Sequence, residues 1–493
     1  MRLKQILLLL SAAIVGLLLL LFVRTLSVPQ VPPATSSPGT HAPVSLQGAA
    51  GRLSEALRLP IVTEDGTPTD EAALGRFHEW LSRTYPALYR AAPPITVGGG
   101  TLIFRLMGSG KAGRPIVLMA HQDVVPVQTP RAWAAAPFSG ELRQGAVWGR
   151  GAIDNRGSLI AIIEVLNKVI EGEERLGRDV YLVSSHDEEG MQSGAKAAAA
   201  WFQEHHIRPE FVLDEGSLVV SDHPVTKGSV ALIGISEKGY ATLRITAHAT
   251  GGHSSAPPSD TAVSTLVEAL RRIAADPFPL HYGGPTKEML DALAPSVPLT
   301  TRIPIANSWL FAPVLERVIG ATPQGAAMLH TTMAPTMLVG SPKANVLPTE
   351  ASAWINYRIA PTDSVEDVVR RARNAVEGLP VALSLEGPAR EPSKVSSSTS
   401  VGFRQISDAA RRTFAVVTAP APVIAATDSR AFNGIADDVY RFQPVELSIA
   451  ETAMIHGTDE HLSVHALQKM VDFYYELLRN TAIEARWGNR LPE

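Results

Sequence analysis

Apolar residues follow two alternating patterns between residues 52 and 214. Short apolar runs, which are typical of buried strands, cover residues 101–107, 116–120, 179–185 and 211–213. Amphipathic stripes, which are typical of helices, begin at Arg52 and cover residues 70–85, 157–170 and 195–205. Strands that alternate with helices favour an α/β fold, in which a mostly parallel sheet has helices on both faces.

The pattern changes after Gly239. A half-exposed strand is predicted at 240–250 and a helix at 261–275, followed by a helix-prone insertion at 285–330. Further elements are predicted at 336–340, at 351–359, from Ser364 (a helix with a capping box to Asp367) and at 381–385. This β-α-β-β-α-β order predicts a two-layer α+β lid domain inserted into the first domain. The boundaries we expect are 49–239 and 389–493 for the catalytic domain, closed by a helix at 463–486, and 240–388 for the lid.

The N-terminus begins with Arg2 and Lys4, followed by an uncharged, leucine-rich run at 6–23. As a helix this run would span roughly 27 Å, close to the thickness of a bilayer core. We therefore expect a transmembrane anchor at 1–24 and a Pro/Ser-rich spacer at 25–48. The positive-inside rule then puts the catalytic body outside the cytoplasm. The alternative is a cleaved signal peptide and a secreted protein, although no small-x-small cleavage site follows the run.

The composition limits which partners and which kinds of metal site the chain can have. A chain of 493 residues is long enough for two domains, and a net charge of −4 gives no sign of a nucleic-acid partner. The chain contains no cysteine, so disulfides and thiolate metal sites are excluded. Any metal ion must therefore be held by His, Asp and Glu side chains.

Several metal-binding side chains stand where the predicted strands end. His121, the pair Glu188 and Glu189, and Asp214 each follow an apolar strand-like run, and ligands of α/β sheets bind at the carboxyl ends of strands. Asp154 lies in the glycine-rich segment WGRGAIDNRG, and a further histidine occurs near the C-terminus. The predicted metal ligands are His121, Asp154, Glu189, Asp214 and His456. These five ligands satisfy two Zn²⁺ ions if Asp154 bridges them, with Co²⁺ or Mn²⁺ as substitutes.

Two carboxylates next to the predicted metal ligands are expected to support the metal site. Asp123, two residues beyond His121, would accept the other ring N–H and orient the imidazole. Glu188 would face the water at the metal ions and act as general base. Each motif alone has a simpler interpretation: a surface pair, a solvated acidic face, a helix cap or a hairpin. Only their combination favours a di-zinc site.

The motifs MAHQDVVPV, WGRGAIDNRG, HDEEG, VLDEGS, GGHSSAPP, NVLP and MIHG, in this order, resemble the di-zinc aminoacylase and carboxypeptidase family of acetylornithine deacetylase and glutamate carboxypeptidase. SEKGY, NSWLF, TDSR and YRFQP resemble in particular its branch of Gly-X carboxypeptidases and N-fatty-acyl-amino-acid synthase/hydrolases. The resemblance runs from about residue 53 to the C-terminal helix. It implies the same five ligands and the same general base.

The resemblance also implies residues that spacing alone does not reveal. His253 matches a lid histidine that stabilises the tetrahedral oxyanion, often across the interface of a homodimer formed through the lid. Asn345 and Arg358 match lid residues that contact substrate, the arginine binding its free carboxylate, and Arg430 in TDSR is a further candidate for contact with substrate. The chain departs from the pattern at Arg156, where many relatives have lysine.

The predicted function is a di-zinc metallohydrolase that cleaves, or reversibly forms, the amide bond of N-acyl amino acids or of peptides with a free C-terminal carboxylate. Its partners are that small-molecule substrate and the membrane. HExxH and GxSxG motifs, which mark other hydrolases, do not occur in the sequence. Two alternatives remain open: a membrane-anchored binding protein with a degenerate hydrolase fold, and a di-zinc aminopeptidase.

Overall fold

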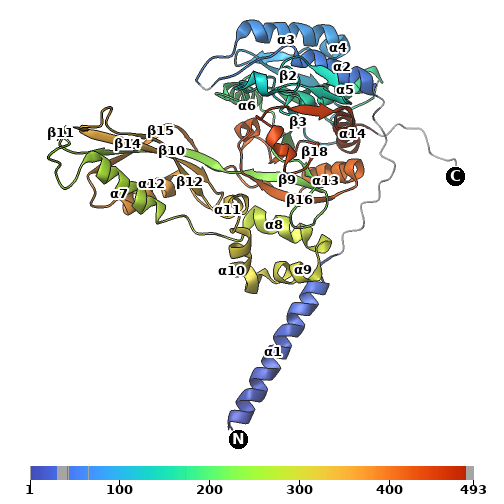
Figure 1. The fold of residues 1–493 in the computed structure, drawn as a ribbon. Helices are drawn as coiled ribbons and strands as arrows, with labels where there is room; N and C mark the ends of the chain where they lie inside the picture. Colours follow the sequence, from blue (N-terminus) through green and yellow to red (C-terminus); the bar gives the residue numbers. More distant parts are fainter. Residues whose placement is uncertain (1, 30–41, 43, 65, 173, 485–493) are drawn as a thin grey trace.

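The computed structural model describes residues 2–29, 42, 44–64, 66–172 and 174–484 (Figure 1). Its largest unit is a ten-stranded sheet in the order β1-β2-β6-β3-β7-β17-β9-β8-β18, with β16 paired to β9. The strands are β1 (Ile95–Val97), β2 (Thr101–Leu106), β3 (Ile116–Met119), β6 (Val180–Ser184), β7 (Phe211–Asp214), β8 (Val219–Val220), β9 (Val230–Glu237), β16 (Val417–Val423), β17 (Asp438–Arg441) and β18 (Glu446–Leu447).

The large sheet is mixed, and its β16-β9 and β18-β8 pairings are parallel in addition to those at its centre. Its centre, β6-β3-β7-β17, is parallel, as predicted for strands joined through helices. The β1-β2-β6 edge and the β17-β9-β8 pairings are antiparallel. An antiparallel partner needs no helical crossover, so strands at the margins can join without the alternation that the sequence pattern showed.

Helices cover both faces of the large sheet. Ile116 and Leu118 of β3 pack in one buried cluster with α2 (Leu46–Leu57), α5 (Arg156–Glu171) and α14 (Val464–Thr481). Val117 and Met119 pack on the other face with α6 (Ser193–Glu204). Because successive strand residues point to opposite faces, a strand buried on both sides reads as an unbroken apolar run. The other helices around this sheet are α3 (Glu71–Thr84), α4 (Pro86–Ala91) and α13 (Val401–Phe414).

A second sheet projects from the first through β9 and β10 (Figure 1). It is antiparallel, in the order β12 (Thr332–Val339), β14 (Glu350–Ile359), β10 (Gly239–His248) and β15 (Val381–Arg390). Helices α7 (Ala262–Ala274) and α12 (Val365–Ala375) pack on one face, against Leu243 and Ile245. The predicted capping box of Ser364 and Asp367 is confirmed at the start of α12. Two short strands, β11 (Gly252–His253) and β13 (Val346–Leu347), pair at the far end.

The helix-prone insertion forms α8 (Gly284–Leu293), α9 (Leu299–Ala306), α10 (Ser308–Ile319) and α11 (Pro323–Leu329). Leu290 and Leu293 of α8 pack against Ala419 and Ala421 of β16, so this part of the insertion lies on the large sheet. Helix α1 (Arg2–Leu26) ends beside α9 and otherwise projects away from the body (Figure 1). Among the described residues it is the one helix that length and composition would allow to cross a membrane.

A third sheet, β4 (Glu141–Arg143), β5 (Ala146–Trp148) and β19 (His461–Ser463), ties the glycine-rich segment to the C-terminal region. The last helix, α14, begins at Val464, as predicted, and ends at Thr481. Residue 486, its predicted end, and most of the predicted spacer lie outside the described residues.

Candidate active site

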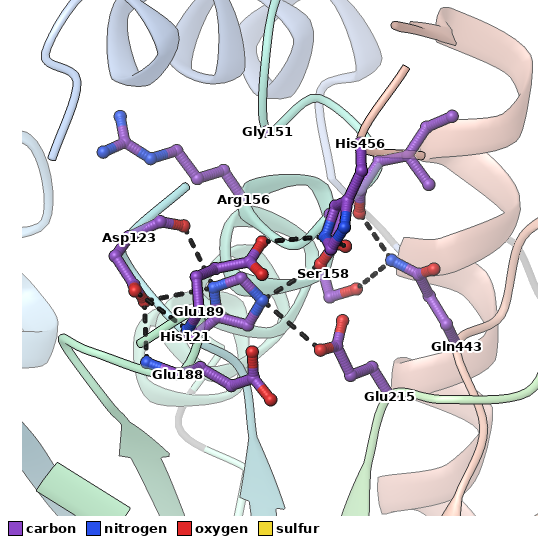
Figure 2. A network of polar contacts seen from close by, with 12 residues as sticks. His121, Asp123, Gly151, Arg156, Ser158, Glu188, Glu189, Glu215, Gln443 and His456 are labelled. Atoms are coloured by element: carbon purple, nitrogen blue, oxygen red, sulfur yellow. Dashed lines mark hydrogen bonds and ion pairs between the residues drawn. The ribbon is translucent and has the colours of Figure 1, made fainter. Parts of the chain in front are cut away.

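Three neighbouring strands deliver acidic and histidine side chains to one edge of the large sheet. His121 follows β3, Glu188 and Glu189 follow β6, and Glu215 follows β7. These strands are parallel neighbours, so their carboxyl ends meet. Asp154 comes from the turn before α5 and His456 from the loop before β19. Figure 2 shows His121, Glu188, Glu189, Glu215 and His456 side by side.

Asp154 lies between the two histidines. Its Oδ1 is 3.0 Å from Nε2 of His121, and its Oδ2 is 3.1 Å from Nε2 of His456. His121 Nε2 is also 3.3 Å from Oε1 of Glu215, and His456 Nε2 is 3.2 Å from Oε1 of Glu189. Three overlapping donor sets result, within each of which the ligand atoms lie no more than 4.8 Å apart: His121–Asp154–Glu215, His456–Asp154–Glu189 and His121–Glu188–Glu189. The arrangement fits two cations that share one carboxylate.

The charges of the cluster favour a cation at its centre. Burial and the neighbouring carboxylates raise the pKa of Glu189 and raise that of Glu215 well above its usual range. Burial alone would also raise the pKa of Asp154, but hydrogen bonds from both histidines hold it well below its usual range. Hydrogen bonds to Asp154 and Glu189 raise the pKa of His456 to about 10. Protons on the two histidines thus supply the positive charge that metal ions would supply.

Asp123 connects the histidine of β3 to the acidic pair of β6. Its carboxylate lies 3.3 Å from Nδ1 of His121 and accepts hydrogen bonds from the backbone N–H groups of Glu188 and Glu189, each at 3.1 Å. Its backbone carbonyl lies 3.0 Å from the same Nδ1. Both contacts leave Nε2 of His121 directed at Asp154. The position suits the orienting role predicted for Asp123.

Glu188 is held by a chain of polar contacts. Gln192 donates from Nε2 to Oε1 of Glu188 at 3.0 Å, and Arg390 in turn donates to Oε1 of Gln192. Burial raises the pKa of Glu188 well above its usual range, with the charges of Asp428 and Glu215 adding to the effect. A raised pKa suits a carboxylate that takes up and releases a proton near neutrality.

Asp214, predicted as a ligand, points elsewhere. Its Oδ1 accepts from the backbone N–H of Glu215 and its Oδ2 from that of Ser429, each at 2.9 Å. The carboxylate that reaches His121 belongs to Glu215, which sequence reasoning missed. Adjacent residues of an extended strand point in opposite directions. A shift of one position in VLDEGS therefore decides whether Asp214 or Glu215 faces His121.

Sequence reasoning also missed a clamp between the two loops that carry Asp154 and His456. Glu460, fully buried, accepts at Oε1 from the N–H groups of Ile153 (2.8 Å) and Asp154 (3.0 Å). Its Oε2 accepts from the N–H of Gly151 (3.0 Å) and from Nη1 of Arg150 (2.7 Å).

The same Arg150 donates from Nη2 to the carbonyl oxygens of His456 (3.0 Å) and Gly457 (2.8 Å). His456 adopts a φ of +60°, which non-glycine residues seldom do, and these bonds hold it there. The Arg150–Glu460 clamp therefore fixes the spacing between the central carboxylate and the second histidine.

The remaining predicted residues fall in two places. His253 and Asn345 lie together at the far end of the small sheet, where the N–H of Ser254 donates to the carbonyl of Asn345. His253 is exposed on β11 at the tip of the small sheet (Figure 1), whereas the His/Asp/Glu cluster lies at the carboxyl edge of the large sheet. The structure therefore does not bring either residue to the cluster of the same chain.

Arg358 and Arg430 lie instead at the hinge, by which we mean residues 237–239 and 390–393, where the small sheet joins the large one. Arg358 lies 5.0 Å from the ring centre of Tyr240, and Arg430 donates to the carbonyls of Lys238 (3.4 Å) and Glu391 (3.2 Å). Burial and the positive charges of Arg390, Arg441 and Arg358 lower the pKa of Arg430, although Glu237 opposes them.

Arg156, at the position where the chain departs from the motif, is buried behind the cluster. It donates from Nε to the carbonyl of Gln122 at 3.0 Å and lies 4.6 Å from the ring centre of Phe77. It supports the backbone next to His121 and contributes no ligand atom.

A mixed α/β sheet with overlapping His/Asp/Glu donor sets at its carboxyl edge defines a metallohydrolase. A model of the peptidase family M20/M25/M40 matches residues 117–480, and the chain belongs to this family. The expected kinship with the aminoacylase and carboxypeptidase group is thereby confirmed.

Relatives agree with this assignment. The chain is 34% identical over 412 residues to probable carboxypeptidase S-like 2 of Dictyostelium discoideum, covering 82% of this chain and 79% of the relative. It is 32% identical over 436 residues to the human N-fatty-acyl-amino acid synthase/hydrolase PM20D1, covering 87% and 86%. The crystal structure of an M20 family metallo-carboxypeptidase from Sulfolobus solfataricus shares the fold, with a TM-score of 0.63, 17% identity and coverage of 87% and 98%.

Proposed function

We propose that this metallohydrolase is a di-zinc enzyme that cleaves, or reversibly forms, the amide bond of N-acyl amino acids or of peptides with a free C-terminal carboxylate. The observation that carries the proposal is Asp154, whose two oxygens face His121 and His456, together with Glu188, whose carboxylate lies within 4.8 Å of ligand atoms of His121 and Glu189. Relatives named as carboxypeptidases and as N-fatty-acyl-amino acid synthase/hydrolases support both substrate classes.

In this proposal His121 and Glu215 hold one cation, His456 and Glu189 hold the other, and Asp154 joins them. Glu215 thus takes the role predicted for Asp214, because Glu215 is the carboxylate that faces His121. When bound, two such cations supply Lewis acidity that activates a water molecule and polarises a carbonyl group.

Glu188 moves the proton. Its carboxylate takes a proton from the attacking water and returns it to the leaving amine, which breaks the C–N bond. Gln192 fixes the orientation of Glu188, and Arg390 fixes that of Gln192. In the reverse direction the same carboxylate accepts the proton of the amine as the amide bond forms.

The hinge supplies the charge for a substrate carboxylate. Arg358, Arg390 and Arg430 lie close enough for their charges to affect one another, and Nη1 of Arg430 is buried without a hydrogen-bond partner among the described residues. A carboxylate would satisfy such a donor through the paired geometry that guanidinium groups offer. An aminopeptidase would need an acidic group for a free amine, so this cationic hinge favours substrates that end in a carboxylate.

We further propose that the lid acts in a homodimer. Strand β12 is an edge strand, and its residues Met337, Leu338 and Val339 are more than half exposed. Val267 of α7 is also 55% exposed. Such an apolar edge is a surface that soluble proteins usually cover. Pairing through it would allow His253 of one chain to approach the metal cluster of its partner.

We also propose that α1 anchors the enzyme in a membrane, with the catalytic body on the extracytoplasmic side. The helix Leu3–Leu26 contains an 18-residue window with a mean hydropathy of 3.2 that is almost wholly exposed. The basic residues Arg2 and Lys4 precede its uncharged run at 6–23. If the segment were a signal peptide, the mature protein would lack it and begin beyond it, which N-terminal sequencing of the purified protein would reveal.

The function is tested with a panel of N-acyl amino acids, dipeptides and C-terminally amidated counterparts, assayed with zinc present. We expect hydrolysis of the free carboxylates, loss of activity after chelation and return with added zinc. Glu188→Gln should be inactive but retain two zinc ions, whereas the exposed Glu141→Gln is the matched control. Turnover of amidated substrates at the same rate, or full activity of chelated protein, would contradict the proposal.

A further inference from the structure

Helix α10 presents a continuous apolar face to the outside. All twelve of its residues are described, and Trp309, Leu310, Val314 and Val318 are between 41% and 66% exposed. Arg317 is the only charged residue in the exposed stripe. The opposite side packs inward, with Leu315 in the same buried cluster as Leu293 and Ile305. A patch of this kind on one helix marks a binding surface.

This face begins at the end of α1. Asn307, the residue before α10, donates from Nδ2 to the backbone carbonyl of Leu21 (3.2 Å) and to Oγ1 of Thr25 (3.1 Å). Asn307 and Thr25 are both fully buried. Specific contacts therefore fix α10 beside the last turns of α1, while the rest of α1 projects away from the body (Figure 1).

The length of α1 determines how deep in a bilayer the start of α10 would lie. The uncharged run at 6–23 spans roughly 27 Å as a helix, close to the thickness of about 30 Å of the hydrocarbon core of a bilayer, and Leu21 and Thr25 stand at its C-terminal end. The turn that contains Leu21 and Thr25 therefore reaches the boundary between acyl chains and headgroups. Since Asn307 contacts that turn, α10 starts at the same level.

We propose that α10 is a second membrane contact, whose face of Trp309, Leu310, Val314 and Val318 inserts at the surface of the bilayer that α1 crosses. The proposal rests on the proposed anchoring by α1. Tryptophan concentrates at membrane interfaces, and aliphatic residues of interfacial helices enter the upper acyl region. Arg24 stands in the last turn of α1 and Arg317 in the exposed stripe of α10, and lipid phosphates offer anionic partners to such residues.

Two contacts constrain the body in a way that one cannot. A single membrane contact leaves the body free to rotate over the membrane, whereas α1 and α10 together fix its tilt. Because α10 begins beside the last turns of α1, the proposed anchor brings its apolar face to the lipid surface, which favours lipid over a second copy of the chain as the occupant.

The test uses the absence of cysteine from the sequence. Single-cysteine variants of the full chain are labelled with an environment-sensitive dye and reconstituted into phosphatidylcholine/phosphatidylserine vesicles. Val318→Cys reports α10, and Glu79→Cys on α3 is the matched control, since the two side chains are 66% and 65% exposed. Helix α3 lies at the end of the molecule opposite α1 (Figure 1). Leu10→Cys reports α1 itself.

We expect the dye at 318 to show blue-shifted emission and a loss of intensity with lipids brominated near the headgroup. The dye at 79 should show neither effect, and the dye at 10 should be quenched by lipids brominated deep in the chain. Adding Leu310→Ser and Val314→Ser should abolish quenching at 318 and leave that at 10 unchanged.

A water-exposed dye at 318 beside a quenched dye at 10 would overturn the docking and leave the anchor intact. A dye at 318 that is shielded but insensitive to brominated lipid would show that protein, either a second copy or another segment, covers α10. An unquenched dye at 10 would remove the anchor and the docking together.

Discussion

The substitution Glu460→Gln tests whether the Arg150–Glu460 clamp positions the metal ligands. The glutamate is fully buried and accepts four hydrogen bonds, three from backbone N–H groups and one from Arg150. Glutamine has nearly the same shape but only one acceptor oxygen. The NH₂ group of the glutamine would replace one of the two oxygens and would face two hydrogen-bond donors. These donors are the N–H groups of Ile153 and Asp154 in one orientation, and the N–H of Gly151 with Arg150 in the other.

The magnitude follows from the geometry. Two of the four acceptor contacts are lost, and Arg150, which is 3% exposed, keeps a charge without its carboxylate. Breaking a buried ion pair by removing one partner costs about 3–5 kcal/mol. Substituting a residue that orients metal ligands typically lowers metal affinity by about 10- to 100-fold. We therefore expect Glu460→Gln to lower zinc affinity by a factor in this range.

The assay combines the thermal unfolding midpoint with zinc affinity measured by chelator competition. A midpoint shift is used because a chain of several units need not unfold in two states. The exposed Glu141→Gln is the control. Arg150→Met added to Glu460→Gln should recover part of the midpoint, because it removes the unpaired charge. It should not recover zinc affinity, because at least one backbone N–H group of the Asp154 turn remains without an acceptor and the bonds from Arg150 to the carbonyls of His456 and Gly457 are also lost. Wild-type zinc affinity in Glu460→Gln would refute the positioning role.

Three further outcomes are expected. Glu188→Gln should lower kcat by about 100- to 10,000-fold, the usual contribution of a general base, with little change in KM or zinc content; an equal loss of bound zinc would argue against a proton-transfer role. Glu215→Gln should lower the zinc content toward one ion per chain, whereas Asp214→Asn should keep two; the reverse pattern in metal analysis would restore Asp214 as the ligand. Contacts with Asp154 and Glu189 raise the pKa of His456 to about 10, so zinc must displace a proton and its affinity should rise with pH. Calorimetry in buffers of different ionisation enthalpy should detect proton release near pH 7, and its absence would contradict the assignment. In the chelated protein the stabilisation by the protonated His456 is present below the ordinary pKa of 6.5 and is lost as pH rises toward 10.

The pattern of apolar residues predicted the central strands and most helices, because this pattern reflects whether an element is buried on one face or on both. The runs at 116–120 and 179–185 became β3 and β6, and the helix after the Asp154 turn became α5. Strands β9, β16 and β17 were not predicted, since their pairing joins residues about two hundred positions apart, such as Val417 with Val230 and Asp438 with Phe211. Antiparallel margins of the sheet carry no sequence signal of their direction.

By itself the sequence determined which chemistry was available: a cysteine-free chain with histidines and carboxylates at strand ends can hold a metal ion only through nitrogen and oxygen. It also determined the apolar N-terminal helix, because composition alone decides whether a segment can enter lipid. Only the tertiary structure decided that Glu215 rather than Asp214 faces His121, since one residue of register reverses the side of a strand. Only tertiary structure, likewise, paired Glu460 with Arg150 and α10 with the end of α1. Such contacts join segments that lie far apart in the chain, and the sequence of one segment does not indicate which other segment it contacts.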